Sequence, residues 1–304
     1  MSTADHMRAS RPFTGVALDR VSTERKDLDW VMAQLASPDA RAVFAGRDGV
    51  LLTNGEPAAM LRVGMTQRQH GELMLLGLED GRALFALDLD TADDGVAATM
   101  AHGRVISLRE AALVLPHHEA GLAAYATAML NWQRRHRFCA NCGHATDSVE
   151  GGYSRHCPQC DTNHFPRTDP VVIMTVEHAG RLLLGRRTGW PAGRLSVLAG
   201  FVSPGESAEE AVMREVREES GILARDPVFV TSQPWPFPAS LMLGFHAEAD
   251  GGEPRNIDGE LEEVHWLDLE TVRRAVEDEA GFVLPGRVSI ARFLIDRWVA
   301  GKGA

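Results

Sequence analysis

The sequence lacks three features that would place the protein in particular classes. No hydrophobic run is long enough to cross a bilayer, and residues 1–6 lack the basic and apolar regions of a secretory signal. We therefore expect a cytoplasmic protein with no membrane partner. A basic excess is also missing, because the net charge is −11 at pH 7, which argues against a broad nucleic-acid footprint. A small anionic substrate held through metal ions remains compatible with this charge.

Cysteine is scarce, and its placement is informative. The 304 residues contain only four cysteines, all between 139 and 160, whereas a disulfide scaffold would scatter them. Four thiolates satisfy tetrahedral Zn²⁺, so two Cys-x-x-Cys pairs separated by fourteen residues predict a structural zinc ribbon with ligands Cys139, Cys142, Cys157 and Cys160. Redox motifs or buried free thiols are the alternative. We interpret the nearby histidines as ordinary polar residues: His136, His144, His156 and His164.

Residues 200–222 carry the densest chemical pattern. Ser207 and Glu210 form a capping-box signal and Gly221 a C-cap signal, which together predict a helix. Three carboxylates at i, i+3 and i+4 share one face of this helix, those of Glu215, Glu218 and Glu219. They repel one another unless cations lie between them, and Mg²⁺ or Mn²⁺ suits such oxygen ligands. A solvated acidic face is the alternative.

The spacing around this helix matches a known motif at every defined position. Gly200-x5-Glu206-x7-Arg214-Glu215-Val216-x-Glu218-Glu219-x-Gly221-Ile222 resembles the Nudix box of the Nudix hydrolase superfamily. The resemblance implies metal-dependent cleavage of phosphoanhydrides of the form nucleoside diphosphate linked to X. It also implies an α+β fold, an α/β/α sandwich around a mixed sheet.

The chain divides into four predicted regions. Residues 1–115 contain short apolar runs between tight-turn signals, which predict a β-rich, mostly antiparallel, Nudix-like domain. A linking helix (116–138), the zinc ribbon (139–165) and the catalytic domain (166–304) follow. The N-terminal runs are 42–45, 50–52, 58–61, 73–76 and 83–87, with a helix around 28–35 and the linking helix over 119–136. The catalytic strands are 171–176, 181–185, 195–198, 228–231, 241–247 and 264–267, with a last helix at about 289–299.

Ser232-Gln-Pro-Trp-Pro-Phe-Pro-Ala-Ser240 is the most unusual stretch of the catalytic region. Its prolines predict an extended segment that does not join a sheet ladder. The rigid rings of Trp235 and Phe237 suit stacking on a planar ligand, and the alternative is a structural loop whose aromatics fill the core. Together with the box and the ribbon, this stretch resembles the NADH pyrophosphatase (NAD⁺ diphosphatase) family from about Phe138 to the C-terminus.

That resemblance implies hydrolysis of NAD(H) to nicotinamide mononucleotide and AMP by a homodimer, and removal of NAD caps from the 5′ end of RNA in bacterial members. The catalytic Mg²⁺ or Mn²⁺ would bind Glu215, Glu219, Glu260 and the Ala199 carbonyl, with Glu262 or Glu263 as alternatives to Glu260. Arg214 would orient the glutamates, Glu218 would act as a ligand or base, and Glu206 would fix the loop.

The resemblance also implies a substrate pocket. Phe201 would stack on the nicotinamide, and Phe165, where the family has a tyrosine, would come from the partner subunit. The remaining pocket residues would be Gln233, Pro234, Trp235, Pro236, Phe237, Pro238, Ala239, Ser240 and Ala291. Two other hypotheses remain open: a hydrolase of ADP-ribose or another nucleoside diphosphate conjugate, and a non-catalytic Nudix-fold sensor.

Overall fold

The computed structural model describes residues 11–65, 74–91 and 100–302. It contains two compact units: an N-terminal unit of Pro12–Thr168 joined by Trp235–Ala239, and a C-terminal unit formed mainly by 169–234 and 240–302. The signal-sequence prediction at 1–6 and Leu73, the first residue of the run 73–76, lie outside the described residues. Within the described part, no helix is both long and apolar enough to cross a membrane.

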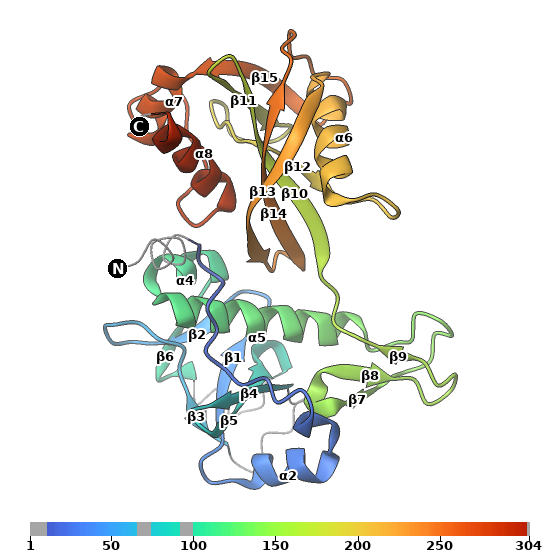
Figure 1. Cartoon of the computed structure of the whole chain (residues 1–304). Coiled ribbons are helices and arrows are strands. Elements are labelled where there is room, and N and C mark those ends of the chain that lie inside the picture. Colours follow the sequence, from blue (N-terminus) through green and yellow to red (C-terminus); the bar gives the residue numbers. More distant parts are fainter. Residues whose placement is uncertain (1–10, 66–73, 92–99, 303–304) are drawn as a thin grey trace. The chain divides into compact units, whose positions relative to one another are not determined.

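The N-terminal unit is built on a six-stranded sheet in the order β4-β5-β1-β2-β6, with β3 paired to β1 (Figure 1). All of its pairs are antiparallel except that of β1 with β5, so the mostly antiparallel prediction is confirmed. Asp80 and Gly81, both with positive φ, make the predicted tight turn from β4 to β5. The run 58–61 is not a strand and contributes only a bridge between Met60 and Leu52. The strands are β1 (Arg41–Ala45), β2 (Val50–Thr53), β3 (Val63–Gly64), β4 (Met74–Glu79), β5 (Arg82–Asp88) and β6 (Gly103–Ile106).

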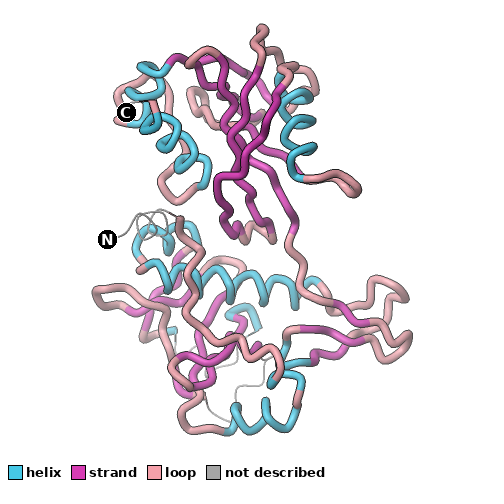
Figure 2. The backbone as a smooth tube through the Cα atoms, viewed as in Figure 1, coloured by secondary structure: helices cyan, strands magenta, loops and turns pink. Residues whose placement is uncertain are grey.

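Helix α5 (His117–Arg135) runs along this sheet (Figure 2). The sequence predicted it as a linking helix, but most of its residues are buried, and Leu122, Met129 and Leu130 share a core with strand residues of the same unit. It is therefore a core element of the N-terminal unit. The other helices here are α2 (Leu28–Ala36), close to its predicted bounds, and α4 (Leu108–Val114), with the 3-10 turns η1 (Glu24–Lys26), η2 (Leu89–Thr91) and η3 (Glu150–Gly152).

After α5 the chain forms a small three-stranded sheet that carries the cysteines. Its antiparallel strands follow the order β7-β8-β9. They are short, and turns and loops make up much of this region, as Figure 2 shows. The strands are β7 (Asp147–Val149), β8 (Ser154–His156) and β9 (Asn163–His164).

The C-terminal unit is a mixed sheet between two helical layers. Its order is β13-β14-β10-β11-β15 with β12 on β10, and β10 pairs in parallel with β14. Helix α6 covers one face, and α7 and α8 cover the other (Figure 1). The predicted α/β/α sandwich is confirmed. Its elements are β10 (Asp169–His178), β11 (Arg181–Arg187), β12 (Leu198–Phe201), α6 (Ala208–Ser220), β13 (Ala224–Trp235), β14 (Ser240–Ala249), β15 (Leu261–Asp268), α7 (Leu269–Val276) and α8 (Ile290–Gly301).

Two strand predictions in this unit are wrong. The strand expected at 195–198 is β12, which starts at Leu198 and continues to Phe201, because it pairs with β10 up to Val171. The expectation that Ser232–Trp235 stays outside the sheet is also wrong, since these residues belong to β13. β13 is an edge strand, and an edge strand tolerates proline because one of its sides makes no ladder hydrogen bonds.

The two sheets share one topology. The first strand of each unit, β1 or β10, lies inside its sheet. It pairs in parallel with the fifth strand (β5 or β14) and antiparallel with the second (β2 or β11) and the third (β3 or β12). The chain between the third and fourth strands is 65–73 in the N-terminal unit and 202–223 in the C-terminal unit. Only the second connection is long enough for the 13-residue helix α6. The N-terminal unit thus repeats the strand order without the glutamate helix.

Candidate active site

Helix α6 begins and ends at the predicted residues. The Ser207 hydroxyl accepts a hydrogen bond from the Glu210 backbone N–H at 3.2 Å, and the Glu210 carboxylate accepts one from the Ser207 N–H at 2.7 Å. Gly221 closes the helix in the left-handed conformation, at φ 70°. These contacts fix both ends of the helix. The helix packs against β12, where the Glu215 carboxylate lies beside Gly200.

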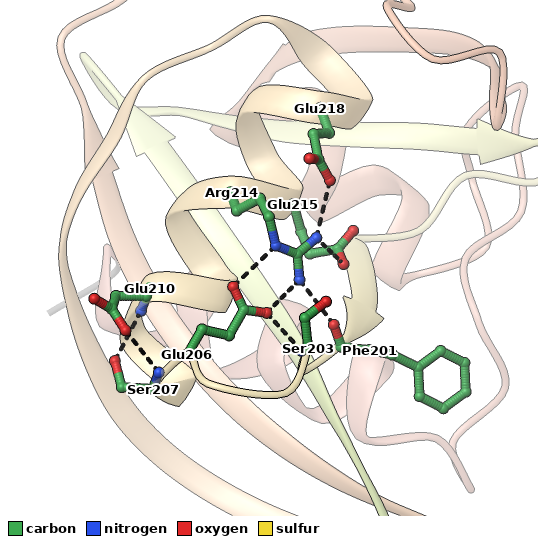
Figure 3. A network of polar contacts seen from close by, with 8 residues as sticks. All are labelled: Phe201, Ser203, Glu206, Ser207, Glu210, Arg214, Glu215 and Glu218. Atoms are coloured by element: carbon green, nitrogen blue, oxygen red, sulfur yellow. Dashed lines mark hydrogen bonds and ion pairs between the residues drawn. The ribbon is translucent and has the colours of Figure 1, made fainter.

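Arg214 joins three glutamates of the box (Figure 3). Its guanidinium donates to Glu215 at 2.7 Å, to Glu218 at 2.9 Å and to Glu206, and also to the Phe201 carbonyl oxygen at 2.9 Å. Glu206 also accepts from the Ser203 N–H at 2.7 Å, and the two donors lower its pKa to about 2. Glu206 is therefore an ionised loop anchor, and Arg214 has the contacts expected of an orienting residue.

Glu219 has the opposite environment. It is 4% exposed, and its Oε2 atom is buried with no hydrogen-bond partner in the described structure. Burial, and then the charges of Glu215, Asp258 and Glu260, raise its pKa to about 8. Burial also raises the pKa of Glu215, although Arg214 opposes this. Because buried polar atoms normally have partners, this orphaned oxygen beside further carboxylates fits a bound divalent cation.

The three acidic candidates at the start of β15 lie in different surroundings. Glu260 accepts a hydrogen bond from Arg187 at 2.8 Å, and its charge acts on both Glu215 and Glu219. Glu262 and Glu263 instead form ion pairs with Arg186. Of the three, Glu260 is the one whose charge acts on the α6 carboxylates. The sequence prediction missed Arg187, since only the fold brings it to Glu260.

The four cysteines form a closed cluster. Their sulfur atoms all lie within 4.8 Å of one another, and among the described residues no other group of three or more potential ligands lies this close. The Thr162 hydroxyl and the Asn141 amide lower the pKa of Cys160 to about 6, which favours a thiolate. His164 Nε2 lies 3.2 Å from the Cys139 sulfur but is not part of the group. This arrangement of four sulfur atoms fits the predicted structural zinc site.

The predicted pocket residues divide into buried and exposed sets. Gln233 is fully buried and ties β13 to the start of α8 through the Val288 carbonyl at 2.9 Å and the Ile290 N–H at 2.7 Å. Ala291 and Ser240 are also buried, whereas the rings of Phe201 and Phe165 are 60% and 63% exposed. Pro234 lies in β13, and Pro236, Pro238 and Ala239 lie in the turn between β13 and β14.

Trp235 and Phe237 pack in the N-terminal unit. Their ring centroids lie 6.0 and 5.9 Å from that of the buried Phe13, and the Arg109 guanidinium lies 4.6 Å from the Phe237 ring centroid. These contacts favour the structural alternative for the two rings.

Comparison with known proteins gives three family matches along the chain. Residues 39–132 match the NADH pyrophosphatase-like rudimentary NUDIX domain, 134–165 the NADH pyrophosphatase zinc ribbon domain, and 166–287 the NUDIX domain. The first match accounts for the repeated strand order described above.

Similar proteins cover nearly the whole chain. The chain is 36% identical to the NAD-capped RNA hydrolase NudC of Mycobacterium bovis, over 94% of this chain and 93% of that protein. It is 39% identical to NudC of Stutzerimonas stutzeri, over 75% and 77% of the two chains. It is 34% identical to the NAD-capped RNA hydrolase NUDT12 of Pongo abelii, over 94% and 73%. With its ribbon cysteines, capped glutamate helix and Arg214 network in place, the chain belongs to the NADH pyrophosphatase family of Nudix hydrolases.

Proposed function

We propose that the protein hydrolyses the pyrophosphate of NAD(H), giving nicotinamide mononucleotide and AMP, and that it also removes NAD caps from RNA. The observation that carries this proposal is the buried Glu219 with its orphaned oxygen beside Glu215, on a helix of a chain whose relatives are named NAD-capped RNA hydrolases. Burial of the Glu219 carboxylate without a partner is unfavourable, and a non-catalytic sensor would not require it.

The residues that would hold the catalytic Mg²⁺ or Mn²⁺ are Glu215, Glu219, Glu260 and the carbonyl of Ala199. Bound there, the metal would neutralise the substrate pyrophosphate and acidify an attacking water. Arg214 keeps Glu215 in place, and Glu206 fixes the loop after β12. Glu218 is half exposed and, within the part of the chain that the structure describes, pairs only with Arg214, so it is available as a further ligand or as the base that takes the proton.

The substrate rings would be held by aromatic stacking. The Phe201 ring is exposed at the end of β12, directly after the Ala199-Gly200 pair, and suits the nicotinamide. The equally exposed Phe165 would reach the site of a second copy in a homodimer. The segment 233–240 and Ala291 would line the remainder of the pocket, with the Trp235 and Phe237 rings anchoring that segment.

A product assay tests this proposal. Purified protein with Mg²⁺ or Mn²⁺ is incubated in parallel with NADH, NAD⁺, ADP-ribose and an NAD-capped RNA. We expect AMP together with nicotinamide mononucleotide from NAD⁺, AMP together with the reduced mononucleotide from NADH, a 5′-monophosphate end on the RNA, and almost no product from Glu219→Gln. Turnover of ADP-ribose alone would contradict the proposed substrate, and no turnover of any compound would favour the sensor.

A further inference from the structure

Arg187 is the last residue of β11, and strand alternation decides where it points. Leu182 and Leu184 pack in the core on the α8 side of the sheet, whereas Leu183 packs with Val212 and Val216 of α6. Arg187 lies four residues after Leu183 on the same strand, so its side chain projects from the face that α6 covers. This is the face that carries Glu215 and Glu219.

A β-bulge occurs at this position. Arg186 pairs with Glu263 of β15, but Arg187 pairs with Leu261, so one residue of β15 is left over between them. Bulges re-aim side chains and are common beside active sites. The residue left over is Glu262 of β15. Glu262 and Glu263 pair with Arg186, whereas Glu260 pairs with Arg187.

Arg214 and Arg187 both act on carboxylates of α6, but they differ in how many acceptors they bind. Arg214 is saturated, because it holds three carboxylates and a carbonyl oxygen and is only 28% exposed. Arg187 is 57% exposed and, among the described residues, donates to Glu260 alone. Its charge also acts on Glu219 and lowers that pKa against the rise caused by burial. The exposed Arg187 guanidinium therefore has N–H groups that are not used by Glu260 and that could bind a further anion.

A fixed pair between Arg187 and Glu260 would conflict with the proposed function, on which this inference rests. If Glu260 holds metal, an arginine at 2.8 Å competes with the metal for the same oxygen. The conflict disappears if the guanidinium moves to another anion when metal and substrate arrive. The arriving anion is the pyrophosphate, and a planar guanidinium binds phosphate oxygens through two parallel hydrogen bonds.

We propose that Arg187 is an exchanging substrate-binding residue: it neutralises Glu260 before metal binds and then transfers its guanidinium to the pyrophosphate of the substrate. In the first state it keeps the cluster of Glu215, Glu219, Asp258 and Glu260 from accumulating unpaired charge. In the second it binds the non-bridging oxygens of the scissile diphosphate.

Two binding measurements without turnover test this exchange. The first is Mn²⁺ affinity without substrate, from the electron paramagnetic resonance signal of free Mn²⁺ with the ribbon zinc retained. The second is the affinity for a non-hydrolysable diphosphate, adenosine 5′-(α,β-methylene)diphosphate, at saturating Mn²⁺. The variants are Arg187→Gln and Arg187→Lys. The control is Arg225→Gln, which removes the same charge from an exposed arginine of the same unit that pairs with Asp226, Glu248 and Asp250.

The exchange predicts effects of opposite sign. Arg187→Gln should bind Mn²⁺ about threefold to fivefold more tightly, because a competing exposed ion pair is gone. It should bind the diphosphate at least about tenfold more weakly, because a charge-assisted contact is lost. Arg187→Lys should keep the Mn²⁺ affinity of the wild type but still lose diphosphate affinity, and Arg225→Gln should change neither.

Any other pattern overturns the inference. Unchanged values in Arg187→Gln would make the pair an ordinary surface ion pair, and tighter Mn²⁺ binding with unchanged diphosphate affinity would make Arg187 a counter-ion only. Weaker diphosphate binding without a gain in Mn²⁺ affinity would exclude the exchange. Neither measurement requires cleavage of NADH, so a failure of the proposed substrate appears separately, in the wild-type product assay.

Discussion

Gly200 leaves the space that the Glu215 carboxylate occupies. A Cβ atom built on Gly200 would lie 1.9 Å from the carboxyl carbon of Glu215 and 2.1 Å from its Oε2. The glutamate cannot simply turn aside, because Arg214 holds it at 2.7 Å. The glycine that opens the box is therefore required by the close approach of one metal-binding candidate to the neighbouring strand.

Gly200→Ala should abolish most activity and also lower stability. The added methyl group overlaps the Glu215 carboxylate that Arg214 holds, so the carboxylate has to move. We expect kcat to fall at least about 100-fold and the free energy of unfolding to fall by about 1–3 kcal/mol. Steady-state kinetics and urea unfolding measure the two effects. The matched control is Gly286→Ala, where an added Cβ meets no atom within 4 Å. Equal activity of the two variants would contradict the steric argument.

Removing Arg214 should affect both the chemistry and the fold. Arg214→Ala leaves Glu206, Glu215 and Glu218 without their shared cation, so we expect kcat to fall about 100-fold and the free energy of unfolding to fall by about 1–3 kcal/mol. Arg214→Lys keeps the charge but cannot reach all four acceptors, and should give intermediate values. Arg217→Ala, an exposed arginine on the same helix, serves as the control. A fully active Arg214→Lys would show that charge alone is sufficient.

Glu219 should make stability without Mg²⁺ or Mn²⁺ depend on pH. Its folded pKa of about 8 is above the ordinary value of 4.5, so the folded state keeps a proton that the unfolded state has lost. The stability contributed by the protonated group is therefore complete below about pH 4.5 and is lost as the pH rises through about 8, by on the order of 5 kcal/mol in total.

Urea unfolding between pH 5 and 9, with the ribbon zinc retained, measures this slope. Glu219→Gln cannot ionise and should show a flatter profile, and added Mn²⁺ should flatten the wild-type profile by binding the ionised form. Parallel profiles for the wild type and Glu219→Gln would refute the assignment of the raised pKa to this residue.

Zinc loss should act on the ribbon first. Cys157 is fully buried, so Cys157→Ser removes a ligand that nothing else can replace. We expect the zinc content to fall from one ion per chain to nearly none, and hydrogen exchange across 139–165 to accelerate at least about tenfold. His164→Gln should keep its zinc, because the four cysteines already complete the shell. Zinc loss in that variant would add His164 to the site.

The aromatic residues should separate into anchors and substrate contacts. Trp235→Ala removes a ring that packs on Phe13, and should lower the free energy of unfolding by about 3 kcal/mol. Phe201→Ala removes an exposed ring, and should change stability by about 0.5 kcal/mol or less while raising KM for NADH. Chemical unfolding and steady-state kinetics on the two variants test this contrast. A stable Trp235→Ala with a raised KM would assign that ring to the pocket.

Local signals made α6 and the ribbon predictable. The caps at Ser207 and Gly221 and the two Cys-x-x-Cys pairs involve neighbours in sequence, so the sequence alone is sufficient to identify them. The limits of β12 were not predictable, because its pairing with β10 decides where it ends. Arg187 was missed for a related reason: its partner Glu260 lies 73 positions further along the chain, and only the pairing of β11 with β15 brings the two residues together.

The two units have the same strand order but differ in the connection between the third and fourth strands. Two copies of a single architecture are present, but only one retains the connection that is long enough for a catalytic helix. The other copy keeps the strand order and a packed core but has only nine residues where the glutamate helix would begin. Strand pairing and core packing are therefore sufficient to maintain this architecture, and the glutamate helix is an addition carried by a single connection.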